Sequence, residues 1–64
     1  MICKKNDSDD YFNYEFVGEN LVNIWNPNKK YGTNGFNEMI LYSRWINEYT
    51  IIDKWRTIKP EKEA

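Results

Sequence analysis

The sequence of 64 residues contains no histidine and only one cysteine, Cys3. Without histidine, the usual general base near neutral pH is missing, and so are the serine–histidine and cysteine–histidine pairs of nucleophilic catalysis and most zinc and copper sites. A lone cysteine can form neither an intramolecular disulfide nor a thiolate metal cluster. We therefore expect a protein that is not an enzyme and that holds no metal and no cofactor.

Long apolar runs are also missing. The longest unbroken one extends from Met39 to Tyr42, whereas a helix that crosses a bilayer needs roughly 20 apolar residues. The first residues, Met1 to Lys5, lead into an acidic stretch, with no apolar segment of the kind found in secretory signals. Together with the free thiol, this predicts a soluble cytoplasmic protein that does not interact with membranes.

Leucine, valine and alanine are scarce, and aromatic residues are abundant. There are two leucines, two valines and one alanine, against three Trp, five Tyr and three Phe. A chain of this size forms one small domain whose core leaves on the order of 3 to 5 kcal/mol of net stability. We expect that core to be largely aromatic. Since so small a domain cannot enclose all its aromatic side chains, we expect some of them to face outward.

The composition also suggests an origin. Asn, Ile, Lys, Tyr and Phe, whose codons are rich in A and T, account for 31 of the 64 residues. An AT-rich genome is the simplest explanation, and a small histidine-free protein from such a genome is consistent with a bacteriophage or another mobile element.

The distribution of charge and apolar residues predicts one α+β domain between two flexible tails. Residues 1–10 are acidic and poor in apolar side chains, and residues 60–64 are similarly polar. We expect these segments to be solvated, and we place the domain at residues 11–59.

The clearest local pattern is that of a β-hairpin. From Tyr11 to Val17, aromatic side chains alternate with polar ones, which is the period of a half-buried strand. Residues 18–20 then have the composition of a short turn, and residues 21–25 are again rich in β-branched and aromatic side chains. This arrangement predicts an antiparallel pair of strands at the start of the domain.

A long loop and a helix are expected to follow the hairpin. Turn-forming residues are concentrated from Asn26 to Gly35, which predicts a loop. After it, apolar residues recur at spacings of three and four, so we expect a helix from about Asn37 to Glu48 with Met39, Tyr42 and Ile46 on its buried face.

The last segment, residues 50–59, is ambiguous. Thr50 and Asp53 have the spacing of a helix capping box, which allows a second short helix. Half of the segment, however, consists of Thr and Ile, which favour strands. We prefer a third strand that returns to the hairpin, since two strands alone are marginally stable.

The first functional hypothesis is a protein-binding module. Leu41 and Trp45 are four residues apart and lie away from the expected buried face of the helix, with Arg44 beside them. Exposed aromatic and arginine side chains are typical anchors of protein interfaces, so we add Trp55 to this set. The hypothesis is that the protein is a small inhibitor or adaptor that blocks a larger intracellular protein. If the same patch is complementary to itself, the protein would form a homodimer.

The alternative hypothesis is nucleic-acid binding. Lys29, Lys30 and Tyr31 in the loop, together with Arg56 and the neighbouring Trp55, combine cations with rings on which bases can stack. The net charge of −1 and the isoelectric point near 5.3 oppose this hypothesis, because nucleic-acid-binding domains are usually basic. We therefore rank it second.

Overall fold

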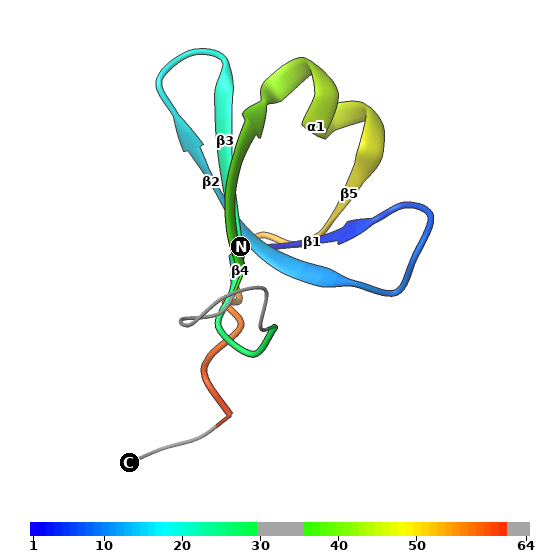
Figure 1. Cartoon of the computed structure of the whole chain (residues 1–64), viewed down its shortest axis with the longest axis vertical. Coiled ribbons are helices and arrows are strands. Elements are labelled where there is room, and N and C mark those ends of the chain that lie inside the picture. Colours follow the sequence, from blue (N-terminus) through cyan, green and yellow to red (C-terminus); the bar gives the residue numbers. More distant parts are fainter. Residues whose placement is uncertain (30–35, 62–64) are drawn as a thin grey trace.

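The protein is described by a computed structural model that covers residues 1–29 and 36–61. In this part of the chain, five strands form one antiparallel sheet in the order β4-β3-β2-β1-β5, and one short helix connects the last two strands. The architecture is a small, mostly β, single domain (Figure 1). The elements are β1 (Ile2–Lys5), β2 (Tyr11–Val17), β3 (Leu21–Asn26), β4 (Phe36–Leu41), α1 (Tyr42–Glu48) and β5 (Tyr49–Asp53).

The hairpin predicted from the sequence is present as β2 and β3. Tyr14 pairs with Ile24 and Phe16 with Val22, so the alternation in the sequence places these side chains on the inner face of the sheet. The turn between the strands contains Gly18, whose backbone has a φ of 66°. This conformation suits glycine because it has no β-carbon to clash with the backbone.

The N-terminal residues do not form the solvated tail that we expected. Residues 2–5 are strand β1, which lies between β2 and β5 and pairs with both. Cys3 is fully buried, and Ile2 is nearly so. The sequence pattern missed this strand because it is only four residues long and two of them are lysines, whose long side chains can keep their charged ends in water.

The expected helix from Asn37 to Glu48 is wrong over its first half. Residues 36–41 are strand β4, in which Ile40 lies opposite Val22 on the inner face. The helix begins only at Tyr42, and it buries Trp45 rather than Met39, Tyr42 and Ile46, which are all about half exposed. The apolar spacing of this segment fits either structure, and pairing with β3 selects the strand.

The segment after the helix is a strand, as we preferred, but a shorter one with a different partner. β5 ends at Asp53 and pairs with β1, not with the hairpin. Residues 54–61 have no regular secondary structure and cross the outer face of the sheet; we call this segment the strap. Of the expected C-terminal tail, residues 62–64 lie outside the described residues, as do residues 30–35 of the expected loop.

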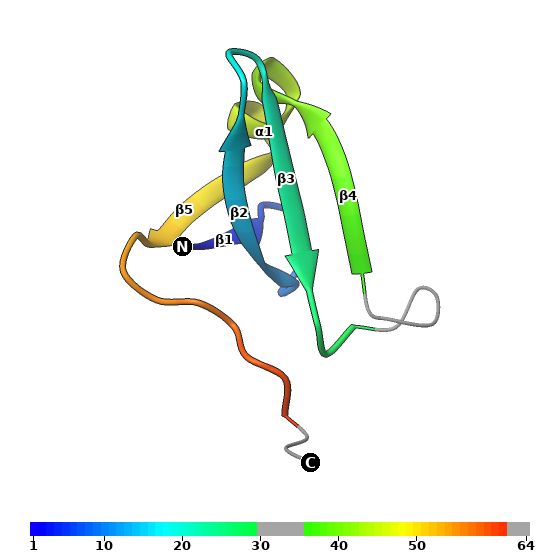
Figure 2. The same cartoon turned by 90° about the vertical axis from the view of Figure 1, so that its left-hand side faces the viewer.

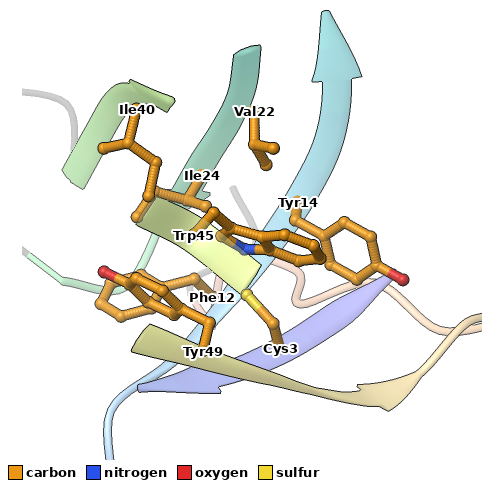
Figure 3. Packing of buried hydrophobic residues seen from close by; sticks show 8 residues of the cluster. All are labelled: Cys3, Phe12, Tyr14, Val22, Ile24, Ile40, Trp45 and Tyr49. Atoms are coloured by element: carbon orange, nitrogen blue, oxygen red, sulfur yellow. The ribbon is translucent and has the colours of Figure 1, made fainter. Parts of the chain in front are cut away.

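The sheet is strongly curved, and the helix lies across its open side. β2 bends so that its first half pairs with β1 and its second half with β3, and α1 bridges the end of β4 and the start of β5 (Figures 1 and 2). The space between them is filled by the core, which contains Cys3, Phe12, Tyr14, Val22, Ile24, Ile40, Trp45 and Tyr49 (Figure 3). No helix in the described residues is long and apolar enough to span a lipid bilayer.

Candidate protein-binding surface

Trp45 was predicted as a partner-binding residue, and the structure corrects this prediction. Its side chain is only 1% exposed and lies at the centre of the core. The ring centroids of Tyr14, Phe16 and Tyr42 lie 5.0, 5.6 and 5.8 Å from that of Trp45. A folded chain cannot offer this side chain to a partner. The helix starts five residues later than expected, and the residue that it turns toward the core is Trp45.

The indole nitrogen of Trp45 is the one polar side-chain atom in the described part of the chain that is buried without a hydrogen-bond partner. It lies beside the sulfur of Cys3, which is at best a weak acceptor (Figure 3). Burial raises the pKa of the Cys3 thiol. The cysteine is therefore kept protonated and inaccessible, which is the environment of a structural residue and not of a nucleophile.

Leu41, the second predicted contact residue, occupies the N-cap position of α1. Its backbone is extended, with φ −67° and ψ 141°, and its side chain makes no capping hydrogen bond. Ser, Thr, Asp and Asn are preferred at this position because their side chains accept a hydrogen bond from the first turn. Leu41 provides no such bond, and it remains 54% exposed. Leu41 thus provides no capping bond for the helix, and its side chain is not part of the buried core.

Leu41 is one of several exposed apolar residues at the end of the sheet where β4 meets α1; the register places Leu41 and Leu21 on the outer face and Phe16 on the inner face. Leu41 lies opposite Leu21 across the β3–β4 pair, and Tyr42 follows it in the chain. The rings of Tyr42 and Phe16 are 6.0 Å apart, and Ile46 lies one helical turn beyond Tyr42. We call this group of residues the apolar rim; its members are Phe16, Leu21, Leu41, Tyr42 and Ile46, of which all but the half-buried Leu21 are 41–54% exposed.

The apolar rim includes a shallow hollow. Phe16, Leu21 and Tyr42 line it together with the turn residues Gly18 and Glu19, and its volume is about 320 Å³. The backbone N–H of Tyr42 donates a hydrogen bond to the carbonyl of Asn20, at 2.8 Å. This bond ties the start of the helix to the β2–β3 turn and so fixes the walls of the hollow relative to each other.

The two other predicted contact residues lie outside the apolar rim. Arg44 forms a salt bridge with Glu48, at 3.0 Å, and lines a separate polar hollow with Lys5, Asn6 and Asp7. Trp55 is 92% exposed and follows β5, which runs away from the helix (Figure 2). The four predicted contact residues therefore lie in four different places, and only Leu41 lies on the apolar rim.

The predicted nucleic-acid residues are partly described. The ammonium group of Lys29 is paired with Asp10, and Arg56 lies near Asp53, with 3.9 Å between Nε and the carboxylate. Lys30 and Tyr31 lie outside the described residues. Both described cations thus have carboxylates close to them, which reduces their attraction for phosphate.

Three asparagines that the sequence analysis did not single out form side-chain hydrogen bonds to distant parts of the backbone or to the neighbouring turn. Asn13 and Asn26 are buried, and the side chain of Asn28 contacts the strap. The sequence offered one indication of this role. Asparagine is unfavourable within strands, and Asn13 lies in the middle of β2. In the described residues there is no cluster of three or more Cys, Asp, Glu or His side chains that could hold a metal ion.

Comparisons with protein-family models, with curated proteins and with solved structures give no match. The functional argument therefore depends on the surface of this chain alone.

Proposed function

We propose that the protein is a non-enzymatic binding module that attaches to a larger protein through the apolar rim, as an inhibitor or adaptor. The observation that carries the proposal is the exposed leucine at the N-cap of α1. A polar residue at position 41 would cap the helix and improve solubility, and leucine does neither. A position is a candidate for function when its residue is not the one that the local structure favours and when it does not stabilise the fold in another way.

The neighbours of Leu41 support the same reading. Phe16, Tyr42 and Ile46 each expose between 41 and 51% of their surface, and Phe16 and Tyr42 line a hollow that could receive a partner side chain. Exposed apolar side chains gathered at one end of a small protein are typical of a protein interface. Aromatic side chains at its centre are the residue type that most often dominates binding energy.

The experiment that tests the proposal uses tagged protein to capture its partner from a bacterial lysate treated with nuclease. Leu41→Ser is the decisive variant, since we expect it to have opposite effects on folding and binding. The serine caps α1 and should raise the free energy of unfolding by about 0.5 to 1 kcal/mol. Affinity for the captured and purified partner should fall at least about tenfold, as measured by calorimetry.

The matched control is Ile52→Ser. Ile52 is also apolar and 51% exposed, but it lies on β5 and outside the apolar rim. We expect this variant to bind the partner with wild-type affinity. The proposal is wrong if Leu41→Ser binds as tightly as the wild type, or if both serine variants lose affinity equally.

Nucleic-acid binding remains the alternative, and the same experiment separates the two. A retained species that disappears with nuclease or with increasing salt would indicate a polyanion. We do not favour this outcome, because the charges of Lys29 and Arg56 are accompanied by Asp10 and Asp53.

A further inference from the structure

The strap is held on the outer face of the sheet by two asparagine side chains. Asn13 Nδ2 donates to the carbonyl of Ile58 at 3.1 Å, and the N–H of Ile58 donates to Asn13 Oδ1 at 2.6 Å. Asn28 binds in the same two-point manner, since its Nδ2 donates to the carbonyl of Lys59 at 2.8 Å and its Oδ1 accepts from the N–H of Glu61 at 2.7 Å. We call Asn13 and Asn28 the asparagine clamp.

The backbone of both clamp residues is held by contacts that do not involve the strap. Asn13 lies at the bend of β2, where it pairs with Ile2 of β1 and with Trp25 of β3. The backbone N–H of Asn28 donates to Asn26 Oδ1 at 2.7 Å, and Asn26 Nδ2 donates to the carbonyl of Tyr11 at 2.8 Å. These bonds hold the backbone of Asn13 and Asn28, so the site that receives the strap is built on β2 and on the turn that follows β3.

All four bonds of the clamp go to the backbone of the strap. They would therefore form equally well with the strap of a second copy of the chain, because the geometry needs only an extended segment of the same length. What distinguishes the two arrangements is the connection between β5 and the strap. Trp55 N donates to Asp53 Oδ1 at 2.7 Å, so the connection is a tight turn stabilised by a single aspartate.

The residues next to this turn are unusually apolar for their exposure. Ile51 and Ile52 are 39% and 51% exposed on β5, and Trp55 is 92% exposed in the turn. β5 is also a terminal strand of the sheet. If the turn opened and two copies exchanged straps, the two β5 strands and turns would come together and these side chains would lose water contact. Exchange of identical elements is a low-cost route to a dimer, since the exchanged contacts already exist in the monomer.

We propose that the strap exchanges between two copies of the chain, so that each asparagine clamp binds the strap of the other copy. The new contact of the dimer consists of Ile51, Ile52 and Trp55 from both copies. It is separate from the apolar rim, so the dimer and the binding of a larger protein can be tested independently.

The test combines two full-length variants that are each defective in one half of the contact. Ile58→Pro removes the N–H that Asn13 accepts, and Asn13→Ala removes the amide that receives it. Neither variant can form this contact with itself. In a mixture, the strap of the Asn13→Ala chain can bind the intact clamp of the Ile58→Pro chain. We expect tagged Ile58→Pro protein to capture untagged Asn13→Ala protein at least about tenfold more tightly than either variant captures itself.

A second pair of variants is needed because Asn13 is buried and the Asn13→Ala protein could fail to fold. Asn28→Ala and Glu61→Pro affect the other end of the clamp at more exposed positions, and they should complement each other in the same way. Ile58→Ala is the matched control for Ile58→Pro, since it keeps the backbone N–H and should need no complementation. Circular dichroism verifies that each variant is folded before the capture.

A third variant tests the new contact of the dimer. In wild-type protein, Trp55→Ser should raise the dissociation constant of the dimer at least about tenfold, as measured by analytical ultracentrifugation. The proposal is overturned if neither complementary pair of folded variants shows preferential capture. It is also overturned if all combinations capture each other equally, because association would then use another surface.

Discussion

At the scale of single residues, Trp45 shows how one side chain can change its role when a helix boundary moves. In a helix that began at Asn37, Trp45 would lie away from the expected buried face. In the actual helix from Tyr42 it faces the sheet and contacts three aromatic rings. The composition had indicated that aromatic residues would be needed inside, since leucine, valine and alanine are scarce. Which tryptophan is inside follows only from where β4 ends.

Replacing Trp45 by alanine should therefore unfold the protein. Removal of a buried tryptophan costs about 3 to 5 kcal/mol, which is comparable with the whole net stability expected for a domain of this size. We expect the far-ultraviolet circular dichroism of Trp45→Ala to lack the native signal at 25 °C. Trp45→Phe keeps most of the ring contacts and removes the unpaired indole N–H, so it should remain folded. A folded Trp45→Ala variant with native stability would contradict the described core.

At the scale of the elements, the β2–β3 hairpin is the part that local sequence determines most fully. Alternation fixes the inward face of β2, and Gly18 provides the one positive φ among the described residues. β4 is the opposite case, because its residues have the spacing of a helix and become a strand only by pairing with β3. β1 is similar, since four residues with two lysines have no independent tendency to form structure and are held by neighbours on both sides.

The hairpin turn gives a prediction at this scale. Gly18→Ala should lower the free energy of unfolding by about 1 kcal/mol, because alanine is strained at a positive φ. A β-carbon at this position would meet no atom within 4 Å, so the loss would come from the backbone conformation and not from a clash. Gly18→Asn should cost less, since asparagine tolerates the left-handed region better. Urea denaturation of the three proteins measures the order, and equal stability of the alanine and wild-type proteins would contradict the turn.

At the scale of the whole molecule, one core contains three groups that resist ionisation. Burial raises the pKa of Cys3, of Tyr14 and of Tyr49, the last to about 12. In the unfolded chain the tyrosines lose their protons near pH 10 and the cysteine somewhat earlier. The folded state therefore binds more protons than the unfolded state in this range, and its stability must decrease as the pH rises.

We accordingly expect the free energy of unfolding to be constant from pH 7 to about 8 and to fall steadily between about pH 9 and pH 12. Urea titrations at a series of pH values, followed by circular dichroism, measure this dependence. Tyr49→Phe has no ionisable group at this position, so the decrease should be smaller between about pH 10 and 12. An unchanged slope in this variant would show that Tyr49 is not the main alkaline-sensitive group.

The amino-acid sequence by itself determined the small size of the core and its aromatic character, and the β2–β3 hairpin with its turn; for the last segment it favoured a strand without excluding a helix. These features depend on composition and on neighbours in the chain, where alternation and turn residues act directly. The exposed leucine at position 41 could also be named from the sequence, although the reason for its exposure could not.

Only the tertiary structure decided the roles of β1 and β4, the burial of Trp45 and the place of the strap. Each of these depends on residues that are far apart in the chain. Cys3 is buried because β2 and β5 meet around it, and Asn13 is buried where the strap crosses 45 residues later. Periodicity within one segment cannot predict such contacts. The free energy that stabilises them comes from packing against a second segment that is distant in the chain.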